Sequence, residues 1–347
     1  MTSLTLRTLA VLALLGGALL GCSEDQNTAD DTQEPVADAS SQDTTDDAAE
    51  PDSALEQDAS EDQEDASEPD VPVEPPPMTP DFLGEDAGDD TEGLMRVLTY
   101  NVAGLPQGVS SSNPVENIPQ ISPLLESYDL VLAQEDFWYY EELRADVTHP
   151  YLTVPWRVSD PTTDNVGDGL NRFSRKPFGM FERVAWGACH GQFDCANDCL
   201  ATKGFSFART ALANGVTVDV YNLHAEAGGC AEDLEARSAG VDRLIAFAQE
   251  HSEGHAMLVA GDFNMHVVRD PEDGVLFQRL LDALGLRDAC WEVDCGTELI
   301  DRILVRSSDA VTLTPQSWSI PPEFVTADGE DLSDHNPVAI ELEWSVP

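Results

Sequence analysis

Basic residues are scarce in this chain and unevenly placed. The 347 residues include 66 Asp and Glu but only 17 Lys and Arg, and no Lys, Arg or His lies between Arg7 and Arg96. Residues 23–93 carry about 26 acidic side chains, and the remainder of the chain still has a net charge of roughly −24. Because nucleic-acid binding draws most of its affinity from Lys and Arg, this shortage disfavours a polyanionic ligand.

Large apolar residues are almost absent between residues 22 and 93. This stretch consists mainly of Asp, Glu, Ala, Ser, Thr and Pro, so it cannot bury enough surface to offset the entropy lost on ordering. Residues 22–93 are therefore predicted to be a disordered acidic linker, stiffened near its end by prolines. A cation-binding or adhesive tail is the alternative, and a solvated spacer is favoured.

A long apolar run is also missing. The N-terminal run covers about 14 residues, Thr8 to Gly21, which is too short to span a bilayer and is typical of a signal peptide over residues 1–21. It ends in Leu19-Leu20-Gly21-Cys22, which resembles a bacterial lipobox and implies lipidation of Cys22 and stable membrane anchoring. Ser23 resembles the outer-membrane sorting pattern of Gram-negative lipoproteins. We expect an exported, lipid-anchored protein; an ordinary signal peptide with a coincidental cysteine is the alternative.

The other cysteines suggest disulfides. An even number in an exported chain allows up to three bonds in 15 pairings, of which Cys290–Cys295 is favoured because it closes a short loop. A zinc site formed by Cys189, His190, Cys195 and Cys199 is the competing hypothesis, although the spacing lacks a second C-x-x-C pair. The six cysteines are Cys189, Cys195, Cys199, Cys230, Cys290 and Cys295.

Residues 94–347 show mixed strand and helix patterns. The dipeptide Asn214-Gly215 predicts a hairpin, and residues 150–177 are expected to form a long loop that enters a strand near 170–174. Hairpins beside βα units imply one α/β domain with mixed sheets. The other expected strands are 95–102, 129–133, 203–213, 216–224, 257–260, 299–305, 311–318 and 337–344, and the expected helices are 114–128, 139–147, 231–251 and 275–284.

Five polar motifs follow in a fixed order, each where an apolar run stops. Side chains at strand ends are held rigidly and face a cleft. Their carboxylate and amide oxygens suit Mg²⁺, and their imidazoles suit proton transfer. The motifs are Thr99-Tyr100-Asn101-Val102, Gln134-Glu135-Asp136, Asn222-Leu223-His224, Gly261-Asp262-Phe263-Asn264 and Ser333-Asp334-His335.

The order and spacing of these motifs resemble the endonuclease/exonuclease/phosphatase superfamily. The resemblance covers residues 94–347 and implies the DNase I-like fold, a four-layer α/β sandwich of two packed mixed β-sheets flanked by helices. In that fold the site lies in a cleft at one edge of the sheets. Any one motif is weak evidence, whereas five in order are specific.

The resemblance also implies roles for the motif residues. Glu135 matches the principal Mg²⁺ ligand, with Asn101 beside it and Asp334 where a further metal or water ligand is found; Mn²⁺ or Ca²⁺ are alternatives to Mg²⁺. Asp262 matches the residue that positions or deprotonates the attacking water, and Asn264 a donor to the phosphorane.

Two histidines complete the implied site. His224 and His335 resemble the pair that binds phosphate and assists the leaving group, and Asp301 resembles the carboxylate that orients His335. Asn222 either supports its strand end or contacts phosphate, and Asp168 and Asn171 are weaker substrate-binding candidates at the cleft rim. The remaining histidines are expected to be structural: His149, His190, His251, His255 and His266.

The implied reaction is in-line attack of water on a phosphodiester without a covalent intermediate. Acidic charge favours a zwitterionic choline phospholipid, and the run Phe137-Trp138-Tyr139-Tyr140 could contact a quaternary ammonium or bilayer, with core or rim residues as the equal alternative. Asn222-x-His224 followed by Ala227-Gly228 resembles the neutral sphingomyelinase branch of the superfamily, and we therefore expect a monomeric sphingomyelinase-like phospholipase C. A secreted DNase I-like endonuclease is the runner-up, and an inositol phosphate phosphatase or a non-catalytic binding protein is less favoured.

Overall fold

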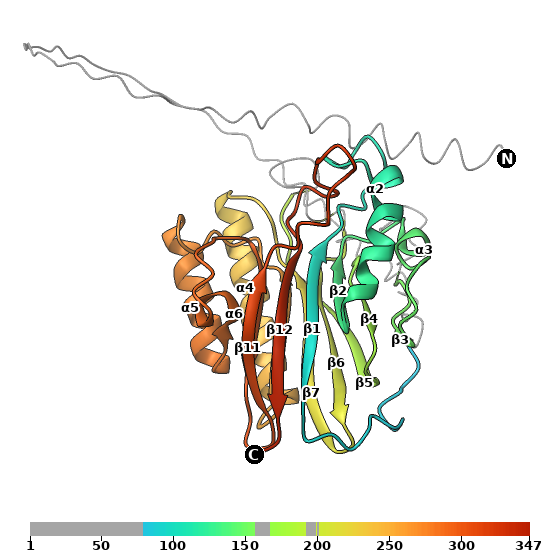
Figure 1. Ribbon diagram of the computed structural model, residues 1–347. Coiled ribbons are helices and arrows are strands. Elements are labelled where there is room, and N and C mark those ends of the chain that lie inside the picture. Colours follow the sequence, from blue (N-terminus) through green and yellow to red (C-terminus); the bar gives the residue numbers. More distant parts are fainter. Residues whose placement is uncertain (1–78, 157–166, 192–198, 200) are drawn as a thin grey trace, which may run out of the picture. The chain divides into compact units, whose positions relative to one another are not determined.

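Two six-stranded sheets pack face to face in the computed structural model, which describes residues 79–156, 167–191, 199 and 201–347. Helices cover the outer faces of the sheets (Figure 1). This arrangement is the predicted four-layer α/β sandwich with two mixed sheets. The expected signal peptide, Cys22, most of the acidic linker, Arg157 and Cys195 lie outside the described residues.

The first sheet has the strand order β11-β12-β1-β2-β4-β3. Strands β1 and β2 are parallel and the other neighbours are antiparallel. Parallel β1 and β2 therefore terminate at the same edge, after Asn101 and Gln134. The strands are β1 (Glu92–Asn101), β2 (Leu130–Gln134), β3 (Tyr151–Leu152), β4 (Asn171–Ser174), β11 (Thr312–Ser319) and β12 (Val338–Ser345).

The second sheet has the order β5-β6-β7-β8-β10-β9, in which β7 and β8 are the parallel pair. The predicted hairpin at Asn214-Gly215 joins β6 to β7 and pairs Gly204 with His224. Its strands are β5 (Phe178–Ala185), β6 (Gly204–Ala213), β7 (Val216–His224), β8 (Ala256–Asp262), β9 (Arg287–Asp288) and β10 (Asp301–Arg306).

Three apolar clusters hold the layers together. Val97 and Leu132 of the first sheet meet Leu258 of the second in the cluster between the sheets. The alternation of side chains along a strand sends neighbouring residues to the opposite face, so Val131 packs under the first helical layer, and Val259 packs under the second.

Local sequence explains where the longer helices begin and end. Asp270 caps α5 by accepting the backbone N–H groups of Glu272 and Asp273, and Gly285 ends it in the left-handed conformation. The expected helix 114–128 ends early, because Pro119 and Pro123 weaken it and its second half forms a 3-10 helix. The helical elements are α2 (Pro114–Ile121), η1 (Ser122–Ser127), α3 (Tyr140–Leu143), α4 (Ala231–His251), α5 (Pro271–Leu284) and α6 (Ala289–Glu292).

Strand β5 has no counterpart among the expected elements. Its pairing with β6 shifts register between Gly179 and Glu182, and Met180 has a positive φ of 53°. Such a bulge breaks the two-residue alternation by which strands are recognised. The expected helix 139–147 is likewise reduced to the four residues of α3. No helix within the described ranges is long and apolar enough to cross a membrane.

The folded part begins before residue 94, where the catalytic domain was expected to start. β1 starts at Glu92, and the segment before it packs on the base of the sandwich, the end opposite the terminus of β1. Phe82 contacts the ring of Phe178, and the Asn214 side chain donates to the carboxylates of Asp86 and Asp89. These contacts attach residues 79–91 to β5 and to the β6–β7 hairpin.

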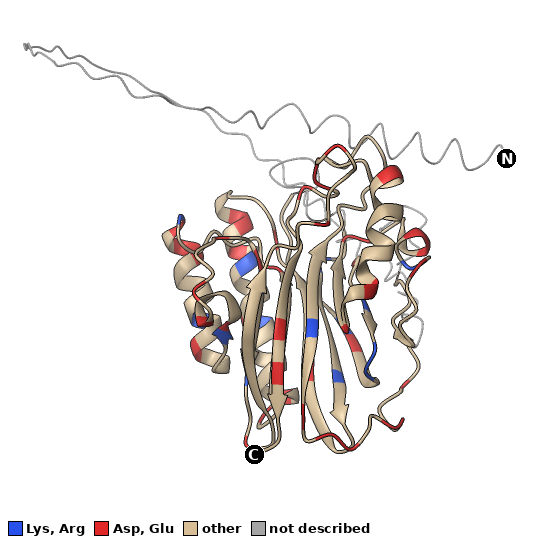
Figure 2. Cartoon of the chain, viewed as in Figure 1, with Lys and Arg blue, Asp and Glu red and all other residues tan. Residues whose placement is uncertain are grey.

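Acidic residues lie around the end of the sandwich at which β1 and β2 terminate. Figure 2 shows them on α2, on α3 and on the loop that precedes β12. In that loop Glu323, Asp328, Glu330 and Asp331 are all exposed. This distribution agrees with the shortage of basic residues in the sequence.

Candidate active site

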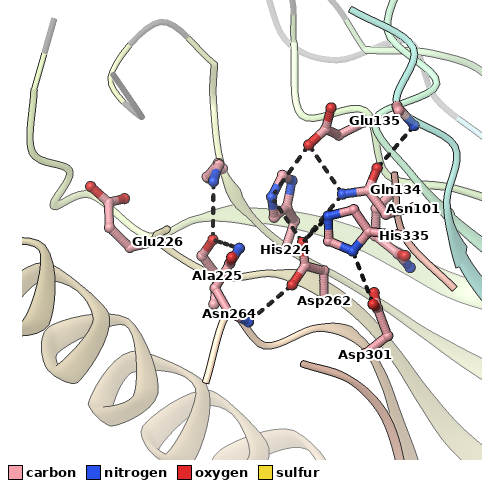
Figure 3. A network of polar contacts seen from close by, with 12 residues as sticks. Asn101, Gln134, Glu135, His224, Ala225, Glu226, Asp262, Asn264, Asp301 and His335 are labelled. Atoms are coloured by element: carbon pink, nitrogen blue, oxygen red, sulfur yellow. Dashed lines mark hydrogen bonds and ion pairs between the residues drawn. The ribbon is translucent and has the colours of Figure 1, made fainter. Parts of the chain in front are cut away.

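Five predicted site residues meet where the strands end (Figure 3). Asn101 ends β1 and Glu135 follows β2, while His224 and Asp262 end the parallel strands β7 and β8. Asp301 begins β10, which runs antiparallel to β8 and pairs with Asp262. The packing of the two sheets therefore brings these motifs into one cluster.

Asp262 lies at the centre of the cluster. Its Oδ2 accepts a hydrogen bond from Asn101 Nδ2 at 3.2 Å and lies 3.5 Å from His224 Nε2 and 3.7 Å from His335 Nε2. Its Oδ1 accepts the backbone N–H of Asn264 at 2.9 Å. One carboxylate oxygen thus faces both imidazoles.

His335 is oriented by a second carboxylate. Its Nδ1 lies 2.9 Å from Asp301 Oδ2, which leaves Nε2 directed toward Asp262. Burial opposes protonation, but the hydrogen bond and charge of Asp301 raise the pKa of His335 to about 10. The pKa of buried His224 is instead lowered by burial and by the charges of Lys203 and His335. The two imidazoles therefore carry different charges at neutral pH.

The backbone around the cluster is strained at three positions. Ala103, Glu135 and Asn264 have φ values of 51°, 59° and 50°, a region that is disfavoured for residues with a Cβ. Strain of this kind persists only where neighbouring structure enforces it, and it is common at active sites. Gly261, before Asp262, has φ 143°, and a Cβ there would lie 2.0 Å from the carbonyl oxygen of Leu223. A glycine is required there.

The donors present fit a hard divalent cation. Burial raises the pKa of Glu135 and of Asp301, and burial together with the charge of Asp301 raises that of Asp262 to about 6. In addition, the buried Oδ1 of Asp301 has no hydrogen-bond partner. Ligand atoms of Asp262, Asp301 and His335 lie within 4.8 Å of one another, although only the two carboxylates would bind a cation while His335 is protonated. Several carboxylates thus lie close together, and each has a raised pKa. A bound cation would stabilise their charged forms.

Asp334 lies at the edge of this cluster. It is exposed, and its carboxylate accepts hydrogen bonds from the hydroxyl groups of Ser111 and Ser333. Buried Ser333 also donates to the carbonyl of Asn101 at 2.7 Å. The motif that carries His335 is therefore attached to the end of β1. Ser333 was part of a predicted motif, but its attaching role was not foreseen.

Asn222 is buried beneath the cluster. Its Nδ2 donates to the carbonyls of Ala133 and Asn171, and its Oδ1 accepts from Gln134 Nε2 at 2.7 Å. These bonds join β7 of one sheet to β2 and β4 of the other. Of the two roles considered for Asn222 from the sequence, these hydrogen bonds agree with the one in which it supports the end of its strand.

Asp168 and Asn171 do not lie at the cleft rim, where the sequence placed them. Both are buried, with 3% and 1% exposure. Asp168 pairs with Arg183 at 2.6 Å, and Asn171 donates to Asp136 Oδ2 at 2.6 Å. Their polar atoms are committed to neighbours inside the protein, so their position as direct substrate contacts is corrected.

Lys203 is a site residue that the sequence analysis missed. Its Nζ donates to the carbonyl of Ala225 at 3.2 Å, the same oxygen that Asn264 Nδ2 binds at 3.1 Å. Its charge lowers the pKa of Glu135, Asp262 and His224. The hairpin signal contained this information, since its register places Lys203 next to the residue that pairs with His224.

The aromatic run after Glu135 belongs mainly to the core. Phe137 and Tyr140 are 4% and 3% exposed, whereas Trp138 and Tyr139 are half-buried. The Tyr139 hydroxyl accepts the backbone N–H of Gln107. These positions agree with the alternative that the aromatic run consists of core and rim residues.

The cysteines that the structure describes form disulfides. Cys290–Cys295 is confirmed, and Cys189–Cys199 removes two ligands from the alternative zinc site. Cys230 is also disulfide-bonded. Among the histidines expected to be structural, His149 binds the carbonyl of Tyr128, His190 binds Asp233, and His251 binds the carbonyl of Phe247.

Sequence comparison finds relatives among curated proteins, although no family model matches the chain. Sphingomyelinases from Mycobacterium bovis and Mycobacterium tuberculosis are each 32% identical to it over 284 residues, or 75% of this chain and 54% of those proteins. The chain thus spans about half the length of the curated relatives that it matches.

Structure comparison finds the same fold in proteins of different function. A beta toxin variant from Staphylococcus aureus with bound magnesium ions has a TM-score of 0.51 and 16% identity, and the match covers 72% of this chain and 99% of the toxin. D. rerio TDP2, complexed with single-strand DNA product, has a TM-score of 0.50 and 17% identity, with 72% and 98% covered. At such identities the likeness shows the fold alone.

Proposed function

Because this chain belongs to the endonuclease/exonuclease/phosphatase superfamily, we propose that it is a metal-dependent phosphodiesterase of the sphingomyelinase type. It would release the phosphorylated headgroup of a choline phospholipid by in-line attack of water. The observation that carries this proposal is the position of Asp262 between two imidazoles, of which His335 is protonated and His224 is neutral.

Each side chain of the cluster has a distinct part in the reaction. Asp262 accepts the proton of the attacking water, because its Oδ2 is oriented by Asn101 and its pKa of about 6 suits a base near neutral pH. His335, held protonated by Asp301, donates through Nε2 to a phosphoryl or leaving-group oxygen. Neutral His224 and the amide of Asn264 supply further hydrogen bonds to the phosphoryl group.

Asn101 and Glu135 would hold the cation, with Asp334 or its bound water as a further ligand. Asn101 Nδ2 donates to Glu135 Oε1 at 3.1 Å, so the amide lies beside the carboxylate, and its Oδ1, which accepts the backbone N–H of Ala103, would have to turn toward a bound cation. Oxygen donors of this kind, with room for water and phosphate, suit Mg²⁺, and Mn²⁺ or Ca²⁺ could replace it. When bound, the cation would neutralise charge that develops on the phosphoryl oxygens.

The substrate assignment rests on charge and on the sphingomyelinase relatives. The sequence holds a small basic cluster at Arg157, Arg172, Arg175 and Lys176. Its described members do not form a phosphate-binding surface: Arg172 is fully buried and binds the carbonyls of Val220 and Ser206. Arg175 pairs with Glu126, and Lys176 binds the carbonyl of Leu212. A zwitterionic lipid does not need such a surface, whereas a nucleic acid does.

Parallel assays test this function. Purified protein with Mg²⁺ is offered sphingomyelin vesicles, DNA and phosphoinositides, with the Asp262→Asn variant and a chelator as controls. Release of phosphocholine by the native protein alone, without nicking of DNA, is the expected result. Nicking of DNA without phosphocholine release would reject the lipid substrate in favour of the endonuclease alternative.

We also propose export and anchoring through a lipidated Cys22, which rests on the lipobox resemblance and the acidic linker of the sequence. The Cys22→Ala variant is expected to move from the membrane fraction to the soluble fraction, because it loses the acyl chains. Labelled fatty acid should enter the native protein and not the variant. Retention of the variant in membranes would reject the anchor.

A further inference from the structure

We propose that Arg183 is a positioning residue for Glu135, acting through Asn171 and Asp136 to hold that carboxylate in its metal-binding position. The inference rests on the proposed function only in taking Glu135 as a metal ligand. The sequence motifs assigned this role to none of the three residues Arg183, Asn171 and Asp136.

The conformation of Glu135 needs external support. It follows β2 directly with φ 59°, which is unfavourable for a residue with a Cβ. Its carbonyl accepts the backbone N–H of Gly104 at 2.9 Å. Gly169 lies so close beneath it that a Cβ there would be 3.0 Å from Glu135 Cα. The turn is therefore held between the segment after β1 and the segment before β4.

Asn171 secures the next residue of this turn. Asn171 Nδ2 donates to Asp136 Oδ2 at 2.6 Å, and both side chains are buried. The amide can do this only in one orientation, with its Oδ1 turned away. That oxygen accepts from Arg183 Nη2 at 2.8 Å and from the Thr153 hydroxyl at 2.9 Å. Two donors therefore fix the amide with its Nδ2 toward Asp136.

Arg183 reaches this position from the other sheet. It lies on β5, and its side chain is only 3% exposed. Nη1 binds both carboxylate oxygens of Asp168 at 2.6 Å and the carbonyl of Leu170 at 2.7 Å, while Nη2 binds the carbonyl of Val154 at 2.8 Å as well as Asn171. The four N–H groups of Nη1 and Nη2 reach these five acceptor atoms when one Nη1 hydrogen is shared between two of them, whereas a lysine ammonium has only three donors at one point.

The arrangement explains the Gly167-Asp168-Gly169 motif. Asp168 neutralises the buried guanidinium, and the Asp168 carboxylate also accepts the backbone N–H of Leu170. Gly169 permits close packing under Glu135 and Phe137, where a side chain would collide with the Phe137 ring at 2.7 Å. The motif thus supports the metal site from below rather than contacting substrate.

Metal affinity distinguishes positioning from general stability. The Arg183→Lys variant keeps the charge near Asp168 but loses the fork that reaches Asn171. We expect its Kd for Mn²⁺, measured by calorimetry without substrate, to rise roughly 10-fold or more, as is common when a hydrogen-bond partner of a metal ligand is lost. Activity is not needed for this measurement.

Arg209→Lys is the matched control. Arg209 also forms an ion pair in the second sheet, a partly buried one with Asp219 at 2.7 Å. That pair lies five residues along β6 from Gly204, whose partner is His224. We expect this variant to lower the midpoint of thermal unfolding without changing the Kd for Mn²⁺. If Arg183→Lys also leaves the Kd unchanged, or if both variants weaken Mn²⁺ equally, the positioning role is rejected.

Asn171→Ala provides a second route if Arg183→Lys fails to fold. It preserves the pair between Arg183 and Asp168 and removes the amide, with its bonds to Asp136, Arg183 and Thr153. The same rise in the Kd for Mn²⁺ is expected for this variant. The proposal is overturned if the variant binds Mn²⁺ as tightly as the native protein does, or if the native protein binds no Mn²⁺. Native Mn²⁺ binding without sphingomyelin hydrolysis would reject the proposed substrate while leaving this inference intact.

Discussion

Two glutamates near the opposite ends of β2 have opposite electrostatic environments. Glu126 lies before the strand at the base of the sandwich, where burial is outweighed by hydrogen bonds from Thr148 and Arg175 that lower its pKa to about 2. Glu135 follows the strand at the cleft, where burial raises its pKa and the amide of Asn101 lowers it less. The same side chain is thus stabilised as an anion at one end and destabilised at the other.

This difference distinguishes structural charge, meaning carboxylates that stabilise the fold, from functional charge, meaning carboxylates that serve the active site. At the base, Glu126 has Arg175 as a partner and His149 close by. At the cleft, Asp262 and Asp301 are buried together, and each has a raised pKa. That arrangement does not stabilise the folded protein, whereas it can bind a cation and a phosphodiester. Substitutions at the two ends should therefore affect stability and turnover in opposite ways.

The largest expected effect follows replacement of the central carboxylate. Asp262→Asn is predicted to lower kcat by roughly 1,000-fold, because the amide cannot accept a proton from water. The thermal midpoint of the metal-free protein should hold or rise, since a buried anion with a raised pKa has been removed. Phosphocholine release and thermal unfolding are the two measurements.

His335→Gln should give a comparable loss of kcat, because it removes the charged donor. Asp242→Asn is the control. Asp242 lies on the exposed face of α4, and among the described residues its ion-pair partner is Arg279 alone. This variant should retain native turnover. Native kcat in Asp262→Asn, or a clear fall in its thermal midpoint, would contradict the contrast between the two ends.

A smaller effect is expected from the cation missed in the sequence. Lys203→Met should lower kcat/KM by roughly 10–100-fold, because its charge stabilises the anionic forms of Glu135 and Asp262. Lys176→Met is a matched control: Lys176 also donates to a backbone carbonyl, but at the base of the sandwich. Equal losses in the two variants would show that the Lys203 charge has no special place in the cleft.

The pKa of His335 tests the site without catalysis. In the metal-free protein it should stay protonated up to about pH 10, because the hydrogen bond and charge of Asp301 outweigh burial. A raised folded-state pKa means that this stabilisation is present below the unfolded value near 6.5 and is lost as the pH rises through 10. Asp301→Asn should lower the pKa by at least about one unit. Imidazole NMR titration measures it, and an unchanged pKa would reject the coupling.

Much of this fold follows from local patterns in the sequence. The hairpin at Asn214-Gly215 and the five motifs at strand ends predicted which side chains converge, because parallel strands such as β1 and β2 terminate at one edge. Helix α4 was predicted at its observed bounds. The metal and catalytic roles of the individual residues stay predictions that the variants above test.

One missed strand explains the main error at the site. β5 was not recognised because its bulge near Met180 interrupts the alternation, so Arg183 could not be placed. Without that buried partner, Asp168 and Asn171 resembled polar rim residues. Burial of a polar side chain depends on a partner distant in sequence, here Arg183 on β5, and a single sequence carries no local signal for such a pairing.

The smallest expected effect concerns the base of the sandwich. Glu126→Gln should lower the free energy of unfolding by about 0.5–1 kcal/mol at pH 7, since the lost pair with Arg175 is partly exposed, and turnover should not change. The folded pKa of about 2 lies below the usual value of 4.5, so the advantage of Glu126 is present above pH 4.5 and is lost as the pH falls through 2. Urea unfolding at pH 7 and pH 3 measures this difference.

The counterpart variant at the other end of β2 completes that experiment. Glu135→Gln removes a carboxylate whose pKa is raised, so the metal-free variant should be at least as stable as the native protein at pH 7 while losing activity and Mn²⁺ binding. The two Gln variants differ only in which end of one short strand they alter. If both lower the free energy of unfolding equally and both retain turnover, the division between structural and functional charge is wrong.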